Sequence, residues 1–281
     1  MSLIWGLNVL VMKWGISDYP PFLFRGFSIA LGLFVVYVFI VATKRSIFVP
    51  LEERWTVFKI AMFTMVLWQL ALVVGLIFLT SGRAAIIGYT MPAWAYLASN
   101  LIYKSRFTFS GSIAAISAFI ATLLLTIAEF EAIRNFPTGA VAMLLGAMSW
   151  GLGTATANNQ KISVENTVVT FWSLTLALIL FVFLFMALEW SQFRWPSYGE
   201  TLAIVYGGVL SLGICYLAWY SLARALPAVV SSLSIMLVPI ISLFGGALVF
   251  GDQIYIEDWI GLILILFAMG MIFYQKKLGK D

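Results

Sequence analysis

Long apolar stretches separated by short polar links run along the whole chain. A transmembrane α-helix needs about 20 predominantly apolar residues. Ten candidate stretches occur, the first of them short, at residues 3–16, 21–42, 57–79, 84–103, 109–128, 137–160, 166–188, 199–222, 228–250 and 257–274. Most links hold fewer than ten residues, so we expect no water-soluble domain between spans. The pattern predicts an all-α membrane protein with ten transmembrane helices.

The amino-acid composition supports lipid as the solvent for this chain. Hydrophobic residues make up 63% of the 281 residues and charged residues 10%, with a mean hydropathy of +1.03. A soluble domain carries about 25% charged residues. One aqueous core could not bury this much apolar surface, so we expect a multi-pass protein whose main partner is the lipid bilayer.

Several kinds of chemistry lack the residues they need. The chain has no His, and its single Cys215 has no second cysteine for a disulfide or a metal site. No Asp or Glu lies in the middle of a predicted span, and no carboxylate cluster or Ser/His arrangement typical of a membrane hydrolase is present. The net charge of +4 is scattered singly rather than along a basic stripe. We expect no enzyme activity, no metal, no cofactor and no nucleic-acid partner.

The Lys and Arg residues predict the orientation, because cytoplasmic links carry an excess of them. With a cytoplasmic N-terminus, the outer links hold Arg83, Arg134, Arg194 and Lys13, and Arg25 lies just inside the second span. The inner links then hold Lys44, Arg45, Arg54, Lys59, Lys104, Arg106, Lys161, Arg224, Lys276, Lys277 and Lys280. This asymmetry predicts that both termini are cytoplasmic. We assign Lys13, Arg25 and Arg83 to helix ends as topology charges.

The turn between the first two spans suggests a role for two of these charges. Pro20 and Pro21 lack backbone N–H groups and therefore belong at a turn or a helix start. Lys13 and Arg25 would then lie near the same end of an antiparallel helix pair. There they can neutralise unpaired carbonyls at a helix end, or they can reach Asp18 in the link.

The ten spans divide into two sets of five, and the second set would begin on the opposite side of the membrane. Setting Pro92 against Pro239, an offset of 147 residues, aligns the small-residue run 84–89 with 231–236. A Trp-Gly pair recurs at nearly the same offset, at Trp5 and Trp150. Chance is the alternative, because Gly, Pro and Trp are common in membrane helices. The pattern favours two inverted repeats, 1–134 and 135–281, with a binding site near the midplane between them.

Polar groups at membrane depth are costly and are usually functional or paired. Asn8 lies within the first span and Gln69 in the middle of the third, where the counterpart in the second repeat is Tyr216. Each amide could bind a substrate, or it could form an interhelical hydrogen bond worth about 0.6 kcal/mol. Both roles stay open on the sequence alone.

The fourth and ninth spans resemble each other, and each carries one proline that we expect to kink its helix. A 3.6-residue period places Gly88, Tyr89 and Pro92 on one face, and Ser232, Met236 and Pro239 on another. We expect these faces to line a central cavity, although small residues also suit plain helix packing. The full set predicted to line the cavity is Asn8, Trp68, Gln69, Gly88, Tyr89, Pro92, Trp150, Tyr216, Ser232, Met236 and Pro239.

These motifs resemble a known family. The opening Trp5-Gly-x-Asn8 with Lys13, the run from Arg83 to Pro92, and the run from Leu226 to Phe250-Gly-Asp252 are similar to EamA-type members of the drug/metabolite transporter superfamily. That family usually has Gly-Glu where this chain has Gly-Asp. The resemblance covers nearly the whole chain and is strongest to bacterial amino-acid exporters. It implies ten helices in two inverted halves, with spans 1, 3, 4, 6, 8 and 9 around a central cavity that opens to one side at a time.

We therefore expect an inner-membrane exporter of amino acids or similar small neutral metabolites. A nucleotide-sugar or phosphorylated-metabolite exchanger is the alternative, although the sequence places Lys13 and Arg25 too near the outer end to bind its phosphates. A non-transporting receptor or a membrane enzyme is the alternative of another class. The glycine-rich faces suit packing within one protomer or between two, so a homodimer stays open.

Overall fold

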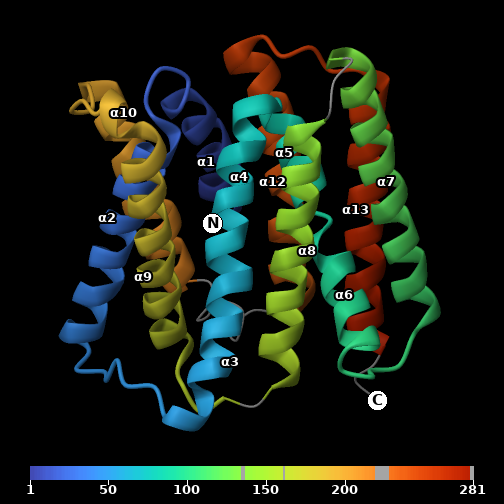
Figure 1. The fold of residues 1–281 in the computed structure, drawn as a ribbon. Coiled ribbons are helices and arrows are strands. Elements are labelled where there is room, and N and C mark those ends of the chain that lie inside the picture. Colours follow the sequence, from blue (N-terminus) through green and yellow to red (C-terminus); the bar gives the residue numbers. More distant parts are fainter. Residues whose placement is uncertain (134–136, 161, 219–227, 279–281) are drawn as a thin grey trace.

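The computed structural model describes residues 1–133, 137–160, 162–218 and 228–278, and side chains for 1–128, 130, 137–160, 162–218 and 236–271 (Figure 1). Over these residues the fold is all-helical. Six helical stretches are long and apolar enough to cross a membrane, namely Pro21–Ala42, Leu51–Phe78, Phe109–Ala128, Thr138–Asn159, Asn166–Gln192 and Tyr198–Ala218. Met236–Phe250 is a shorter apolar helix.

The helices of the first half follow the predicted spans closely. They are α1 (Ser2–Gly15), α2 (Pro21–Ala42), α3 (Leu51–Ala61), α4 (Leu67–Phe78), α5 (Ser81–Gly88), α6 (Met91–Leu101) and α7 (Phe109–Ile133). A π-helical segment, η1 (Met62–Val66), joins α3 to α4 into one long helix. This helix begins at Leu51, directly after Pro50, six residues before the predicted start at 57.

The second half has the same kinds of element. They are α8 (Thr138–Asn159), α9 (Asn166–Leu184) with η2 (Phe185–Glu189) and η3 (Trp190–Gln192), α10 (Tyr198–Val205) with the π-helical η4 (Tyr206–Ile214), α12 (Ala228–Phe250) and α13 (Ile256–Leu278). Two of the three π segments, η1 and η4, interrupt otherwise regular α-helices, and such segments occur often at functional sites.

The predicted kink at Pro92 is wrong in form, because the fourth span is broken rather than bent. α5 ends at Gly88, and Thr90 precedes the first turn of α6, where Pro92 lies. A proline in a first turn removes no helical hydrogen bond. Pro239 does lie inside an unbroken helix, α12.

Elements from the two halves pack against each other throughout the bundle. α7 and α13 lie side by side at one edge, and α2 packs on α9 at the other (Figure 1). Between these edges α1 packs on α12, and α8 packs on α4, α5 and α6. α2 also contacts η4, and α9 contacts α3 and η1.

Glycines allow the closest of these approaches. A Cβ atom on Gly208 would lie 2.6 Å from the carbonyl oxygen of Ser28 and 2.7 Å from Cβ of Leu31, so η4 meets the backbone of α2 directly. Glycine at such positions is the usual basis of close helix packing in membranes.

We predict that Gly208→Ala separates η4 from α2. The new methyl group meets a carbonyl oxygen that cannot turn away, and overpacking of this kind costs about 1–3 kcal/mol. The thermal unfolding temperature in detergent should fall. Gly270→Ala in α13 is the matched control, since its Cβ would meet nothing within 4 Å. An equal effect of both variants would contradict the role of Gly208.

Candidate functional site

Four half-buried aromatic rings from four helical spans form a continuous row. The ring of Trp5 in α1 lies 5.9 Å from that of Tyr216, which follows η4. Tyr216 lies 6.5 Å from Trp150 in α8, and Trp150 lies 5.4 Å from Trp68 in α4. The edge-to-face arrangement of Trp5 with Tyr216 and of Trp150 with Trp68 is favourable for aromatic pairs. The structure thus brings together the predicted residues Trp68, Trp150 and Tyr216.

Trp5 completes this row, although we had not included it in the predicted cavity. Its indole Nε1 donates to the carbonyl of Ser211 at 3.4 Å, which ties α1 to η4. The signal that could have found it is the Trp-Gly pair shared with Trp150, because Trp150 was included. We call these four residues the aromatic row.

Arg25 does not behave as the topology charge that its position in the sequence indicated. Its side chain is 1% exposed. Nε donates to Oε1 of Gln69 at 3.1 Å, and Nη2 donates to the same oxygen. Gln69 is itself buried, and its Nε2 contacts the sulfur of Met65 at 3.3 Å. Arg25 therefore reaches from the start of α2 to the polar centre of the third span.

The amide of Asn8, in α1, lies close to η4 and α2. It is 6% exposed, and its Oδ1 accepts no hydrogen bond from the described residues. The position of a Cβ atom on Gly207 is 3.3 Å from this Oδ1 and 3.4 Å from Oγ of Ser28. Ser28 is one helical turn from Arg25 and shares its face of α2. Asn8 and Ser28 therefore face the same region between α1, α2 and η4, and Arg25 lies one turn of α2 away from it.

Residues of the broken fourth span contribute a second wall. A Cβ on Gly88 would lie 3.0 Å from Cη2 of Trp68 and 2.8 Å from Cε of Met143, so the break sits directly against the aromatic row. Tyr89, at the break, is 8% exposed. Pro92 is half-buried, one turn further on.

The predicted residues of the ninth span lie in or beside α12. Pro239 is buried, and Met236 is half-buried and packs against the hydrophobic core. The side chain of Ser232 lies outside the described residues. α12 contacts α1 through Ser242, whose hydroxyl donates to the carbonyl of Gly6 at 3.3 Å.

Lys13 and Arg83 both make specific contacts at the end of the bundle. Lys13 Nζ donates to the carbonyls of Leu76 at 2.6 Å and Leu79 at 2.9 Å, so it neutralises the C-terminus of α4. Arg83 is buried and pairs with Asp258 of α13 at 2.8 Å. Its guanidinium is therefore an ion-pair partner between α5 and α13 rather than a free topology charge.

The comparison with known families decides the class of protein. The EamA-like transporter family matches residues 1–127 and 137–274. The chain belongs to the EamA-like transporter family. It is therefore a membrane transporter of the drug/metabolite superfamily, as the sequence motifs predicted.

Relatives of this EamA-like transporter span its full length. It is 24% identical to the uncharacterized transporter YoaV of Bacillus subtilis, over 99% of this chain and 96% of that protein. It is 22% identical to YvbV of the same organism, also named an uncharacterized transporter, over 100% and 91% of the two chains. A solved crystal structure, 18% identical, superposes with a TM-score of 0.65 over 100% of this chain and 99% of the other, which shows a common fold.

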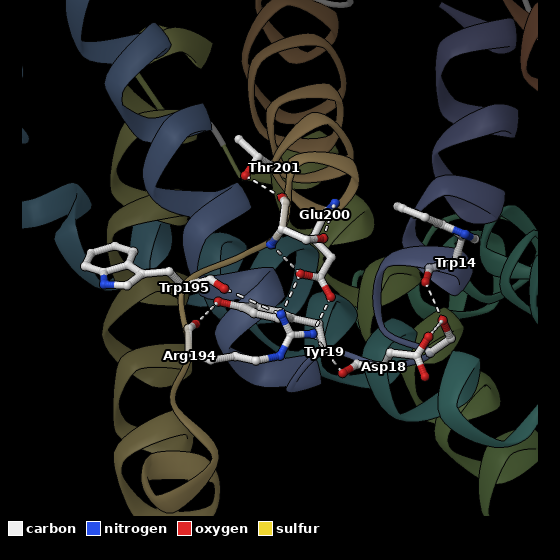
Figure 2. Close-up of polar contacts among 9 residues, drawn as sticks. Trp14, Asp18, Tyr19, Arg194, Trp195, Glu200 and Thr201 are labelled. Atoms are coloured by element: carbon white, nitrogen blue, oxygen red, sulfur yellow. Dashed lines mark hydrogen bonds and ion pairs between the residues drawn. The ribbon is translucent and has the colours of Figure 1, made fainter.

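One end of the transporter is held by a polar network around Arg194 (Figure 2). Arg194 lies in the link before α10, pairs with Glu200, donates to the carbonyl of Asp18 at 3.1 Å, and lies over the ring of Tyr19. Tyr19 donates in turn to the carbonyl of Arg194 at 2.9 Å. Burial raises the pKa of Tyr19 to about 12, assisted by the carboxylates of Glu200 and Glu189 and opposed by Arg194. This network fastens the α1–α2 link to α10.

A pocket of about 370 Å³ lies beside this network and is lined by Ile16, Ser17, Asp18, Tyr19, Pro20, Pro21, Gln192 and Arg194. It is separate from the aromatic row. Among the described residues, no group of three His, Cys, Asp or Glu side chains could hold a metal ion.

We predict that Lys13→Met weakens the EamA-like bundle. The substitution keeps most of the apolar volume but leaves the carbonyls of Leu76 and Leu79 without their charged donor, and such bonds contribute about 1.5–3 kcal/mol each. The unfolding temperature in detergent should fall, and Lys13→Arg should restore most of it. Lys44→Met, at an exposed position after α2, is the control. If Lys13→Met leaves the unfolding temperature unchanged, water can replace the lysine as the donor to these carbonyls.

Proposed function

We propose that this transporter exports amino acids, or similar small neutral metabolites, across the bacterial inner membrane by alternating access. The observation that carries the proposal is the aromatic row, whose rings come from α1, α4, α8 and the residues after η4. Beside it lie the buried polar groups of Asn8, Arg25 and Gln69. Apolar and aromatic walls with a few placed polar groups are typical of small-molecule sites.

Two inverted repeats of five helices, 1–134 and 135–281, would account for the arrangement of this site. In support, the family matches the chain in two stretches. At the offset of 147, η1 corresponds to residues 209–213, which lie inside η4. Exchanging the halves also turns the packing of α2 on η4 into the packing of α9 on η1, and both contacts occur. In the aromatic row, Trp5 and Trp150 are related at nearly the same offset, and Tyr216 corresponds to Gln69, the chain neighbour of Trp68.

Alternating access follows from this symmetry, because two equivalent halves can rock about a site between them. Proton coupling is not expected. The buried carboxylates whose side chains the structure describes all have partners near span ends. Glu189 accepts from the backbone N–H groups of Phe22 and Leu23, Glu200 binds Arg194, and Asp258 binds Arg83.

The proposed orientation, with both termini cytoplasmic, predicts opposite labelling of two links. Ser17, in the α1–α2 link, and Ser46, in the α2–α3 link, are both exposed, and the native Cys215 is buried and should not react. A membrane-impermeant maleimide should label Ser17→Cys on intact spheroplasts, and should label Ser46→Cys only after permeabilisation. The reverse pattern would invert the orientation.

Asn8→Ala should lower transport with little change in stability. Oδ1 of Asn8 accepts no bond from the described residues, so a role in binding substrate predicts a loss equivalent to one hydrogen bond, roughly 5-fold in initial rate. The assay is the flux of labelled tryptophan, threonine and methionine into proteoliposomes, with and without an imposed pH gradient. Wild-type flux should saturate and should not respond to the gradient.

Asn158→Ala is the matched control, because Asn158 is exposed near the end of α8. If Asn8→Ala transports at the wild-type rate, Asn8 has only a packing role. If no amino acid enters the proteoliposomes, the proposed substrate class is wrong and the nucleotide-sugar alternative comes next.

A further inference from the structure

Arg25 is a buried cation without a described counter-ion. Its side chain is 1% exposed, its contact through Nε and Nη2 is the neutral amide of Gln69, and Nη1 has no hydrogen-bond partner among the described residues. Within a membrane protein an ionised group is expensive unless it is paired or faces a functional pathway. A structural arginine in such a place would be expected to meet a carboxylate.

The buried carboxylates of the described part of the chain are engaged elsewhere. Glu189 covers the N–H groups of Phe22 and Leu23 at the start of the same helix, at 3.1 and 3.0 Å. Glu200 binds Arg194, and Asp258 binds Arg83. The segment 219–235, outside the described side chains, contains no Asp or Glu. The missing negative charge is therefore not supplied by these parts of the protein.

We propose that Arg25 and Gln69 form a subsite for the carboxylate group of the transported substrate. Nη1 would donate to the carboxylate, and the bond to Gln69 would hold the guanidinium in a fixed orientation. This inference rests on the proposed function, because a group that is 1% exposed can meet a substrate only when the surrounding helices move apart. Alternating access supplies that movement.

A carboxylate fits this subsite better than a phosphate. A phosphate monoester carries a charge of about −1.5 to −2 at neutral pH and would need a second cation. Two candidates in the described part of the chain are committed: Lys13 binds the carbonyls of Leu76 and Leu79, and Arg83 binds Asp258. One guanidinium balances one carboxylate, and the planar fork matches carboxylate geometry.

The aromatic row supplies the rest of the recognition. Trp68 is the chain neighbour of Gln69, and its ring lies 5.4 Å from that of Trp150, which in turn lies 6.5 Å from Tyr216. A ligand held by its carboxylate at Arg25 would thus place its side chain among aromatic surfaces. Phenyl compounds are suitable probes because they share one apolar group and differ in the group that Arg25 would bind.

The experiment compares 3-phenylpropionate, phenylalanine, phenylalaninamide and phenyl phosphate as ligands of the purified full-length protein. Binding is measured from the ligand-dependent shift in unfolding temperature in detergent, and flux is measured by counterflow in proteoliposomes. Wild type should bind the two carboxylates roughly 10- to 100-fold more tightly than the amide, as expected for a charge-assisted hydrogen bond. Arg25→Gln should reduce the carboxylates to the affinity of the amide and leave the amide unchanged.

Two further variants separate recognition from structure. Arg25→Lys keeps the positive charge but loses the planar guanidinium, so it should retain part of the preference for carboxylate. This variant also tests the subsite if Arg25→Gln does not fold. Arg45→Gln is the matched control, because Arg45 pairs with Glu165 at an exposed position and should change nothing.

The outcomes distinguish this subsite from the proposed transport function. Equal binding of acid and amide by wild type, an equal loss of both in Arg25→Gln, a preference for phenyl phosphate, or no binding of any probe would overturn the subsite. Flux of amino acids in any of those cases would leave the transport function standing. An Arg25-dependent preference for carboxylate without counterflow would support the subsite and contradict transport.

Discussion

Lipid offers no hydrogen bonds, so a chain that crosses it must satisfy its own polar groups. This constraint explains many side-chain contacts of the protein. The hydroxyls of Thr122, Thr170 and Ser173 donate back to carbonyls four residues earlier, so these small polar residues can lie inside apolar helices. At helix ends, longer side chains bind the backbone groups that have no partner within the helix. Lys13 binds the last carbonyls of α4, and Glu189 binds the first N–H groups of α2.

Against this background the unsatisfied groups stand out. Three buried side-chain atoms have no hydrogen-bond partner among the described residues: Oδ1 of Asn8, Nη1 of Arg25 and Nδ2 of Asn100. Two of them lie on α1 and α2, beside η4 and near the aromatic row. An unpaired acceptor on α1 and an unpaired donor of a cation on α2 together have the polarity that a zwitterionic ligand would complement. An unpaired buried polar group is costly in a low-dielectric interior, which supports the proposed role of these residues in binding a polar solute.

Much of the fold could be predicted from hydrophobic pattern, because lipid fixes both the length and the character of a spanning helix. The spans 21–42 and 228–250 coincide with α2 and α12. Residues identified by internal similarity also came together, since Trp150 and Trp68 share a contact with each other and Tyr216 joins them. The break between Gly88 and Met91 could not be predicted from Pro92 alone. A proline fits a kink and a first turn equally well, and tertiary packing of Gly88 against Trp68 and Met143 decides between them.

Arg25 was harder to predict for a different reason. Its position four residues after Pro21 places its Cα near a helix start, where arginine usually reaches outward to the interface. Sequence gives the position of the Cα but not the direction of a long side chain. Here the guanidinium turns inward to Gln69, a partner 44 residues away. The amide of Gln69 was recognised as a candidate, but its partner was not.

In the proposed repeat, the two halves share π-helical segments and Trp-Gly pairs but differ in their polar side chains. At the offset of 147, Asn8 corresponds to Ala155, Gln69 to Tyr216, and Arg25 to Trp172, whose indole donates to Ile47 at 3.0 Å. The π segments η1 and η4 and the Trp-Gly pairs at Trp5 and Trp150 are common to both halves. In the proposed mechanism, a symmetric scaffold would exchange inward and outward states with similar energies, while an asymmetric polar set would hold the substrate in one orientation. Since Arg25 belongs to one half only, movement between the halves would change the surroundings of the bound group, and that change would couple binding to transport.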